Sequence, residues 1–193
     1  MSPEEVRDRL SQRLGIDVDW HEAAPGDPFG EVPSDRWVEA CRIARGDEVL
    51  FFDFLRAQTG TDYPAEQTIE VVVHLFSYKH RHAFVLKTRI GREDPVLESV
   101  QHIWPAANWY EREIYDLLGV RFLNHPDLRR LLLPTVWVGH PLRKDYQQPE
   151  SYRGIPTTRP GYEKPEAQPA KAKPEKAKKT AAAPAGEDGE ASQ

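Results

Sequence analysis

"TIEVVVHLFSYKHRHAFVLKTRI", residues 68–90, is the stretch that decides the fold class. It is rich in β-branched and aromatic residues on both sides of a short polar segment, a pattern typical of two strands joined by a turn. Alternation along the first strand predicts one face with Val71, Val73, Leu75 and Ser77 and an opposite face with Val72, His74, Phe76 and Tyr78.

The sequence on either side adds a third strand and several helices. "EVLFFDFLRAQ", residues 48–58, has the same β-rich character, and "IDVDW", residues 16–20, can form a short strand before a Pro/Gly-rich loop. Helices are predicted at Ser2–Gly15, where Ser2 and Glu5 form a capping box, and from the cap Ser34 to Gly46. The sequence therefore predicts an α+β domain with helices packed on a mostly antiparallel sheet.

Three further helices are expected downstream of the strands. Asp94 and Pro95 open one that runs to Trp104. Asn108 caps a second that ends at Gly119, and a short third one has Pro126 in its first turn.

Composition indicates one domain with appendages. The chain has 193 residues and a net charge of −5. We predict an α+β core at 1–134, an extended docking arm at 135–162 and a disordered tail at 163–193. The tail consists mainly of Ala, Lys, Pro and Glu, which bury too little apolar area to offset the entropy of ordering. Its lysines between 171 and 179 could touch nucleic acid or anionic lipid, but a solvated tail is the simpler interpretation.

Several function classes are disfavoured. Cys41 is the single cysteine, so neither a disulfide within the chain nor a thiolate-held zinc or iron–sulfur centre is expected. The start "MSPEEVRDRL" lacks the apolar core of a secretory signal and no apolar run is of membrane-spanning length, so we expect the cytoplasm or its membrane surface. Nucleotide, redox and hydrolase fingerprints are also missing, which argues against an independent catalyst.

Charged residues crowd the helix predicted after Asn108. Glu111 and Glu113 lie about 200° apart around a helix axis, so they cannot act together as a general acid and base. Arg112 can pair with Asp116 one turn later. A cation from elsewhere is also expected to meet these acids, and the candidates are Arg129, Arg130 and Arg143. Ion pairs packed against aromatic residues favour a folding and docking role over catalysis.

Histidines offer an alternative interpretation. His125 and Asp127, with His140, could begin the site of a small metal-dependent hydrolase, although so few ligands make this a remote alternative. His74, His80 and His82 are expected to form a surface cluster.

From Val136 to about Tyr162 the sequence is rich in Pro, Gly, Tyr and Arg without helical or strand periodicity. Tyr and Arg are favoured at protein interfaces, so we interpret this stretch as an arm that lies on a partner. A flexible linker is the alternative.

Two blocks resemble a known family. "ANWYEREIYDLLGVRFLNHPDLRRLLLP", residues 107–134, and "GHPLRKDY", residues 139–146, are similar to the signature of the 30 kDa subunit of respiratory complex I, also called the C subunit of NADH–quinone oxidoreductase. Ala107 and Asn124 stand where glycine is common in that family, and Leu118 stands where an aromatic residue or Met is frequent.

The resemblance implies a non-catalytic, cofactor-free subunit in a hetero-oligomer. It would dock on the 49 kDa subunit, in the peripheral arm on the cytoplasmic side of the membrane. The complex passes electrons from NADH through FMN and iron–sulfur clusters, held by partner subunits, to quinone, and pumps protons. The residues expected to serve docking are Glu111, Arg112, Glu113, Asp116, His125, Asp127, Arg129, Arg130, His140, Arg143, Lys144, Asp145 and Tyr146.

Another kind of complex stays open as an alternative. A homologous subunit of a membrane-bound hydrogenase, or of another quinone- or ferredoxin-linked complex, would have the same fold. A nucleic-acid binder acting through the Lys-rich tail conflicts with the net negative charge.

Overall fold

The computed structural model describes residues 1–22 and 26–157, and the predicted tail and the last residues of the predicted arm lie outside that range. Residues 1–149 form one unit, and a second unit begins at Glu150. The first unit contains α1 (Pro3–Leu14), β1 (Asp19–His21), β2 (Phe29–Glu31), the 3-10 helix η1 (Ser34–Arg36), α2 (Trp37–Gly46), β3 (Phe54–Tyr63), β4 (Thr68–Ser77), β5 (His82–Gly91), β6 (Val96–Glu98), α3 (Ala107–Leu118) and β7 (Arg121–Leu123). The second contains an antiparallel pair, β8 (Ser151–Tyr152) and β9 (Ile155–Pro156).

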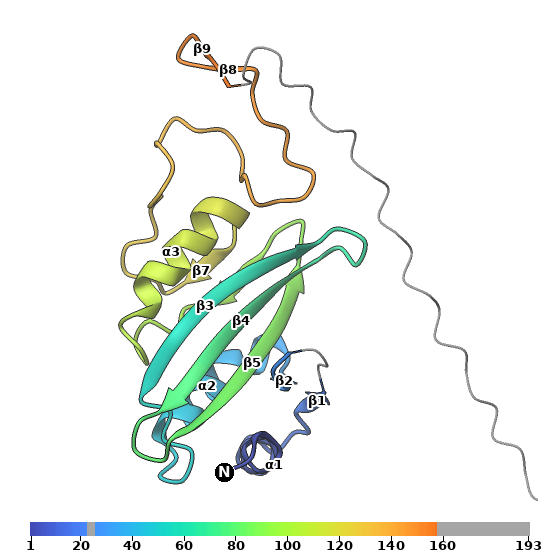
Figure 1. Ribbon diagram of the computed structural model, residues 1–193, viewed down its shortest axis with the longest axis vertical. Coiled ribbons are helices and arrows are strands. Elements are labelled where there is room, and N and C mark those ends of the chain that lie inside the picture. The colour runs from blue at the N-terminus through green and yellow to red at the C-terminus, as the bar shows by residue number, and fades with distance from the viewer. Residues whose placement is uncertain (23–25, 158–193) are drawn as a thin grey trace, which may run out of the picture. The chain divides into compact units, whose positions relative to one another are not determined.

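The main sheet has five strands in the order β1-β2-β5-β4-β3. Neighbours run antiparallel except β2 and β5, which are parallel. A small parallel pair joins β6 to β7. In Figure 1 the strands β3, β4 and β5 lie in front of α2, and α3 runs beside β3. The predicted α+β class with a mostly antiparallel sheet is confirmed.

One face of β4 supplies much of the core. Val71, Val73, Leu75 and Ser77 are all buried, whereas His74 and Phe76 are half-buried and Tyr78 is exposed. The predicted alternation is confirmed at these positions, whereas Val72, predicted on the same face as His74, is also buried. Gly60 in β3 marks how closely α3 packs on this inner face, since a Cβ there would lie 2.5 Å from Leu118 Cδ1.

Helix α1 has the predicted capping box. The Ser2 Oγ accepts the Glu5 N–H at 3.2 Å, and the Glu5 carboxylate accepts the Ser2 N–H at 2.8 Å. Gly15 ends the helix with φ of 69°, in the left-handed region. These contacts lie within one turn of the chain, which is why the sequence alone predicts them.

Two features before β3 differ from expectation. Ser34 begins the 3-10 turn η1, and α2 starts only at Trp37, so Ser34 is not the α-helix cap that we predicted. Residues 29–31, expected in a loop, form β2 because they pair with Val85–Lys87 of β5, far along the chain.

Three predictions downstream of β5 are wrong. No helix follows Asp94 and Pro95, since residues 96–98 form β6. Helix α3 starts at Ala107 with Ala106 at its N-cap, so Asn108 lies inside the helix. Residues 121–123 form β7 against β6, and the segment around Pro126 makes turns without a helix. Each three-residue strand depends on its partner, so local sequence does not reveal it.

None of the helices formed by residues 1–22 and 26–157 combines the length and the apolar character required to cross a bilayer.

Candidate functional site

Asp116 near the end of α3 binds the segment that follows β7. Its Oδ1 accepts from Arg130 Nη1 at 2.8 Å. Its Oδ2 accepts the backbone N–H groups of Leu131, Leu132 and Leu133 at 3.1, 2.8 and 2.8 Å. Burial alone would raise the pKa of the Asp116 carboxyl, but these N–H groups and Arg130 outweigh burial and hold the pKa below its usual value. One buried carboxylate thus fixes the backbone of three successive residues.

The block "GHPLRKDY" completes the end of the same helix. The Leu142 N–H donates to the Leu117 carbonyl at 3.0 Å, and Arg143 Nε donates to the Leu118 carbonyl at 2.8 Å. These carbonyls lie in the last turn of α3, where no later helical N–H exists to satisfy them. Residues far along the chain therefore cap α3.

His140 takes part in the same cap. Its Nδ1 lies 3.0 Å from the Asp116 carbonyl oxygen and donates to it. The ring sits against Gly119, where a Cβ would come within 2.6 Å of His140 Nε2. Gly119 also has φ of 81°, so both its conformation and its neighbour require glycine.

A second contact joins this block to the ends of β3 and β5. Asp62 is buried and accepts from Arg92 Nε at 2.6 Å and from the Lys144 N–H at 2.8 Å. Arg92 also pairs with Asp145 at 2.6 Å. Arg92 is the largest cause holding the pKa of Asp62 below its usual value. Lys144 and Asp145 are thereby held at the ends of these strands.

Glu111 is fully buried beneath these contacts. Its oxygens accept from the Ser99 hydroxyl at 2.6 Å and from the Val100 N–H at 2.8 Å. Burial raises the pKa of the Glu111 carboxyl to about 7, against the lowering effect of these two hydrogen bonds. Glu111 therefore joins α3 to the segment after β6.

The neighbouring His125 is a neutral imidazole. Its Nδ1 accepts the Asp127 N–H at 3.1 Å, and its Nε2 donates to the Asn108 carbonyl at 3.3 Å. Burial lowers the pKa of His125. Its Nε2 lies 3.9 Å from a Glu111 oxygen.

Arg112 does not pair with Asp116, although the helical spacing allows it. Its guanidinium instead donates to the carbonyls of Arg129 and Arg130 at 3.2 and 3.4 Å, and it lies 5.1 Å from the ring centroid of Trp109. Arg112 thus supports the same segment that Asp116 holds.

The remaining predicted residues are more peripheral. Glu113 is exposed, on the opposite side of α3 from Glu111 as predicted. Asp127 and Arg129 form an exposed pair at 2.8 Å. Tyr146 packs on Gly139, where a Cβ would lie 3.0 Å from its ring.

The residues of the alternative metal site lie in different surroundings. Among the described residues, no group of three or more His, Cys, Asp and Glu side chains is placed to hold a metal ion. The prediction that His74, His80 and His82 form a surface cluster is partly wrong. His82 is buried, and its Nε2 lies 2.7 Å from the Leu50 carbonyl oxygen.

Apolar side chains project from the segment that Asp116 holds. Leu132 and Val138 are 60% and 82% exposed, and Val136 and Leu142 are also exposed. This segment, residues 131–142, is called the apolar loop below. Its backbone is fixed at Leu131–Leu133 and at Leu142, and four of its apolar side chains, those of Leu132, Val136, Val138 and Leu142, are exposed.

Sequence reasoning missed Asp62, Arg92 and Ser99 as parts of this arrangement. Gly119 was predicted to end the helix, and it does so in the left-handed conformation. Asp62 and Arg92 become neighbours only through the pairing of β3, β4 and β5, which no local pattern reveals.

Comparison with known proteins shows the family. The family model described as "Respiratory-chain NADH dehydrogenase, 30 Kd subunit" matches residues 30–152. The chain is 38% identical to the C subunit of the NADH-quinone oxidoreductase of Chlorobium phaeobacteroides over 77% of this chain and 90% of that protein. It is 44% identical to the C subunit of the F420H2 dehydrogenase of Methanosarcina mazei over 60% of this chain and 73% of the relative.

Two solved structures have a similar fold. A trypsin-resistant fragment of Nqo5 matches with a TM-score of 0.55 and 29% identity, over 65% of this chain and 98% of the fragment. A chain of a membrane-bound sulfane sulfur reductase, an archaeal respiratory membrane complex, matches with a TM-score of 0.59 and 25% identity, over 75% of this chain and 85% of that chain.

Proposed function

Because the chain belongs to the respiratory-chain NADH dehydrogenase 30 kDa subunit family, we propose that it is a cofactor-free subunit that docks on the 49 kDa-type subunit of an NADH–quinone oxidoreductase. Family membership makes it a subunit of a multi-subunit, membrane-associated complex, and so part of a hetero-oligomer. The proposal concerns its neighbour, its lack of cofactor and its place in the peripheral arm on the cytoplasmic side.

The observation that carries the docking proposal is the apolar loop. A buried carboxylate, Asp116, and Arg130 fix its backbone, yet Leu132 and Val138 are left exposed. A rigid loop with exposed apolar side chains loses little entropy when it binds, because its backbone is already ordered. Contiguous exposed apolar side chains also mark interaction sites. The loop therefore supports docking on a protein partner.

The thirteen predicted docking residues then divide into two roles, and docking by any of them stays a prediction. Those with buried or capping contacts would shape the docking surface, and these are Glu111, Arg112, Asp116, His125, Arg130, His140, Arg143 and Tyr146. The others would touch the partner directly, and these are Glu113, Asp127, Arg129, Lys144 and Asp145.

We propose that the electron carriers of the complex, FMN and iron–sulfur clusters, reside in partner subunits. Cys41 is the only cysteine of the sequence, and it is buried in the core. Thiolate ligation of an iron–sulfur cluster normally takes several cysteines. On this proposal the chain holds the electron-carrying subunits in register and performs no chemistry itself.

A second candidate is the same role in a complex with another electron donor. The similarity to the C subunit of F420H2 dehydrogenase and to a chain of a sulfane sulfur reductase favours it. A hydrogenase or a ferredoxin-linked complex belongs to the same class of alternatives. In all of them this chain would dock in the same way.

The test is purification of the full chain, affinity-tagged at its own locus, after extraction in mild detergent. Mass spectrometry identifies the proteins that accompany it, and NADH–quinone activity is assayed on the same material. We expect NADH-dependent quinone reduction and a 49 kDa-type subunit that forms cross-links with the apolar loop. A large assembly that oxidises only F420H2 or hydrogen would support the second candidate, and a lone monomer would contradict both.

A further inference from the structure

Among residues 1–22 and 26–157, no helix covers the second face of the main sheet. The inner face, with Val71 and Leu75, packs toward the helices, and Ile114 of α3 approaches Gly60 there. The outer face carries His74 and Phe76 and faces the viewer in Figure 1. Antiparallel sheets often expose one face, but such a face is normally polar. The outer face here is partly aromatic.

Aromatic rings gather at one end of this face. The ring centroids of Phe54 and Phe76 lie 5.4 and 5.1 Å from that of Tyr78, both in edge-on arrangements. Phe54 is 43% exposed and Tyr78 is 63% exposed. Rings of this size left in water are costly in a monomer and typical of protein interfaces.

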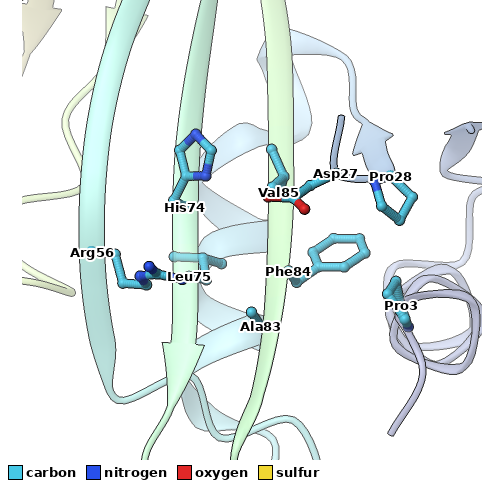
Figure 2. Close-up of a pocket in the computed structure, with 9 residues that line it drawn as sticks. All are labelled: Pro3, Asp27, Pro28, Arg56, His74, Leu75, Ala83, Phe84 and Val85. Atoms are coloured by element: carbon cyan, nitrogen blue, oxygen red, sulfur yellow. The ribbon is translucent and has the colours of Figure 1, made fainter. Parts of the chain in front are cut away.

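The aromatic cluster opens into a continuous depression. Three adjoining hollows run along β3, β4 and β5, the first two sharing Arg56 and the last two sharing His74 and Val85. Figure 2 shows the middle hollow, with Arg56 and His74 on neighbouring strands and Asp27 at the β5 side. We call this depression the outer groove, lined by Phe54, Arg56, His74, Phe76, Tyr78 and Val85.

Charge in the outer groove is unbalanced at the Arg56 end. Within the described part of the chain, the Arg56 guanidinium forms no salt bridge, and Asp27, the acidic residue that lines the same middle hollow, lies on its β5 side. At the other end of the same face, Lys87 and Arg89 both pair with Glu70. The sheet therefore neutralises its cations at one end and leaves Arg56 unpaired beside the exposed rings.

The openness of the outer groove argues against a small organic ligand. Its three hollows have volumes of about 340, 210 and 360 Å³ and are open to solvent. Pockets for drug-sized molecules are typically about 300–1,000 Å³ and enclose most of the ligand. Shallow aromatic grooves with an arginine suit the side chains of a protein segment.

We propose that the outer groove is an interface for a neighbouring subunit of the same complex, which lays an apolar segment with a carboxylate across β3, β4 and β5. The carboxylate meets Arg56, and apolar side chains cover the rings of Phe54 and Tyr78. The partner segment is expected to contain a carboxylate because its binding would bury the aromatic surface around the unpaired Arg56 guanidinium, and a buried guanidinium requires a counter-charge. The outer groove shares no residue with the apolar loop, so the two surfaces can be tested separately.

The experiment uses the full chain within its assembled complex. A photo-crosslinking phenylalanine analogue replaces Tyr78, and the detergent-solubilised complex is irradiated and digested for mass spectrometry. We expect a cross-link to another subunit, at a peptide with Asp or Glu next to apolar residues. Cross-links to a second copy of this chain, to residues 158–193 of the same chain, or to nothing would overturn the proposal. The same probe at Asp17, an exposed position outside the groove, is expected to give no such cross-link.

A charge reversal tests the role of Arg56. Arg56→Glu is expected to lower the yield of intact complex at least tenfold and to leave the melting temperature of the free chain unchanged. Lys79→Glu, the same reversal on the exposed turn between β4 and β5, is expected to leave the yield unchanged. Recovery of the yield when the cross-linked carboxylate of the partner becomes Lys would support the pairing. An unchanged yield with Arg56→Glu would overturn it. Neither result depends on where the apolar loop docks.

Discussion

Asp116 illustrates which contacts of a single residue can be predicted from the sequence. A cation from beyond α3 was expected to meet the acids of that helix, and Arg130, one of three candidates, does so. The expected pair between Arg112 and Asp116 does not form, because Arg112 turns to the carbonyls of Arg129 and Arg130. The three backbone donors to Asp116 were not predictable, since they depend on the path of residues 131–133 through space.

Asn124 explains one departure from the family pattern. Glycine is common at this position in the family, and Asn124 has φ of 60°, in the left-handed region. Asn tolerates that conformation better than most residues other than glycine. The departure therefore keeps the turn.

Glu111 should make stability depend on pH near neutrality. Its pKa rises from an ordinary value of 4.5 to about 7 in the folded chain, so its stabilisation is complete below pH 4.5 and is lost as pH rises through 7. Glu111→Gln keeps an acceptor for Val100 N–H without a charge. We expect the variant to gain about 2–3 kcal/mol over the natural chain between pH 5 and pH 8. Urea unfolding of both proteins at each pH measures this difference.

Subtracting the two curves removes the opposite contribution of His125, whose lowered pKa makes the folded chain less stable as pH falls. Parallel curves would show that Glu111 does not titrate in this range.

Gly119 and Gly15 form a matched pair for substitution. Both end helices with positive φ, but a Cβ at Gly15 meets nothing within 4 Å, whereas one at Gly119 meets His140. We expect Gly15→Ala to cost about 1 kcal/mol from its left-handed backbone alone. Gly119→Ala should cost about 1–2 kcal/mol more, because His140 must leave the Asp116 carbonyl. Urea unfolding of the two variants checks this, and equal losses would show that His140 adapts freely.

At the scale of helices and strands, the sequence predicted those elements that are stabilised by interactions within a short segment. The helix α1, the strands β4 and β5 and the burial pattern of β4 follow from short-range caps and alternation. The strands β2, β6 and β7 have three residues each and exist through pairing with distant segments. The expected helix at 94–104 failed for the same reason, because pairing of β6 with β7 overrode the helical signal. The expected helix near Pro126 does not form either, and those residues make turns.

The end of α3 and the apolar loop should behave as one unit. Asp116→Asn removes the charge that faces Arg130 and weakens acceptance from three N–H groups. We expect a loss of about 3 kcal/mol in unfolding free energy. Amide hydrogen exchange at residues 131–133 and at Leu142 should accelerate together, since both ends of the loop pack on this helix.

Asp127→Asn is the control, because Asp127 forms an exposed pair with Arg129. We expect little change in stability there. Faster exchange at residues 131–133 with no change at Leu142 would show that the two ends of the loop move independently.

At the scale of the whole molecule, fold and family were predictable and the function of the surfaces was less so. The charged signature residues have recognisable spacing, so the family follows from the sequence. The outer groove was not foreseen, because Phe54 and Arg56 of β3 meet Tyr78, just after β4, only through a strand register that appears in the folded sheet. The exposure of Leu132 and Val138 likewise depends on how Asp116 turns the backbone.

Assembly, and not folding, should respond to changes in the apolar loop. Leu132→Asp with Val138→Asp adds charge to two exposed side chains, so we expect an unchanged melting temperature for the free chain. The yield of assembled complex should fall at least tenfold, as charge would be buried at the interface. Native electrophoresis of detergent extracts measures the yield. Val49→Asp, an exposed apolar position outside both surfaces, should assemble normally, and equal loss in both variants would contradict docking through the loop.

The contact between Asp62 and the Lys144 N–H spans 82 positions of the chain. During synthesis, this contact can form only after Lys144 has been added. At about 5–20 residues per second, a ribosome needs roughly 4–16 seconds to make the chain between them. During that interval β4, β5 and α3 are made, and together with β3 they exist before the residues that close them. The apolar loop acquires its fixed shape only once Leu142 and its neighbours have been added, so a nascent chain that already contains the whole sheet is still incompetent to engage a partner through the loop.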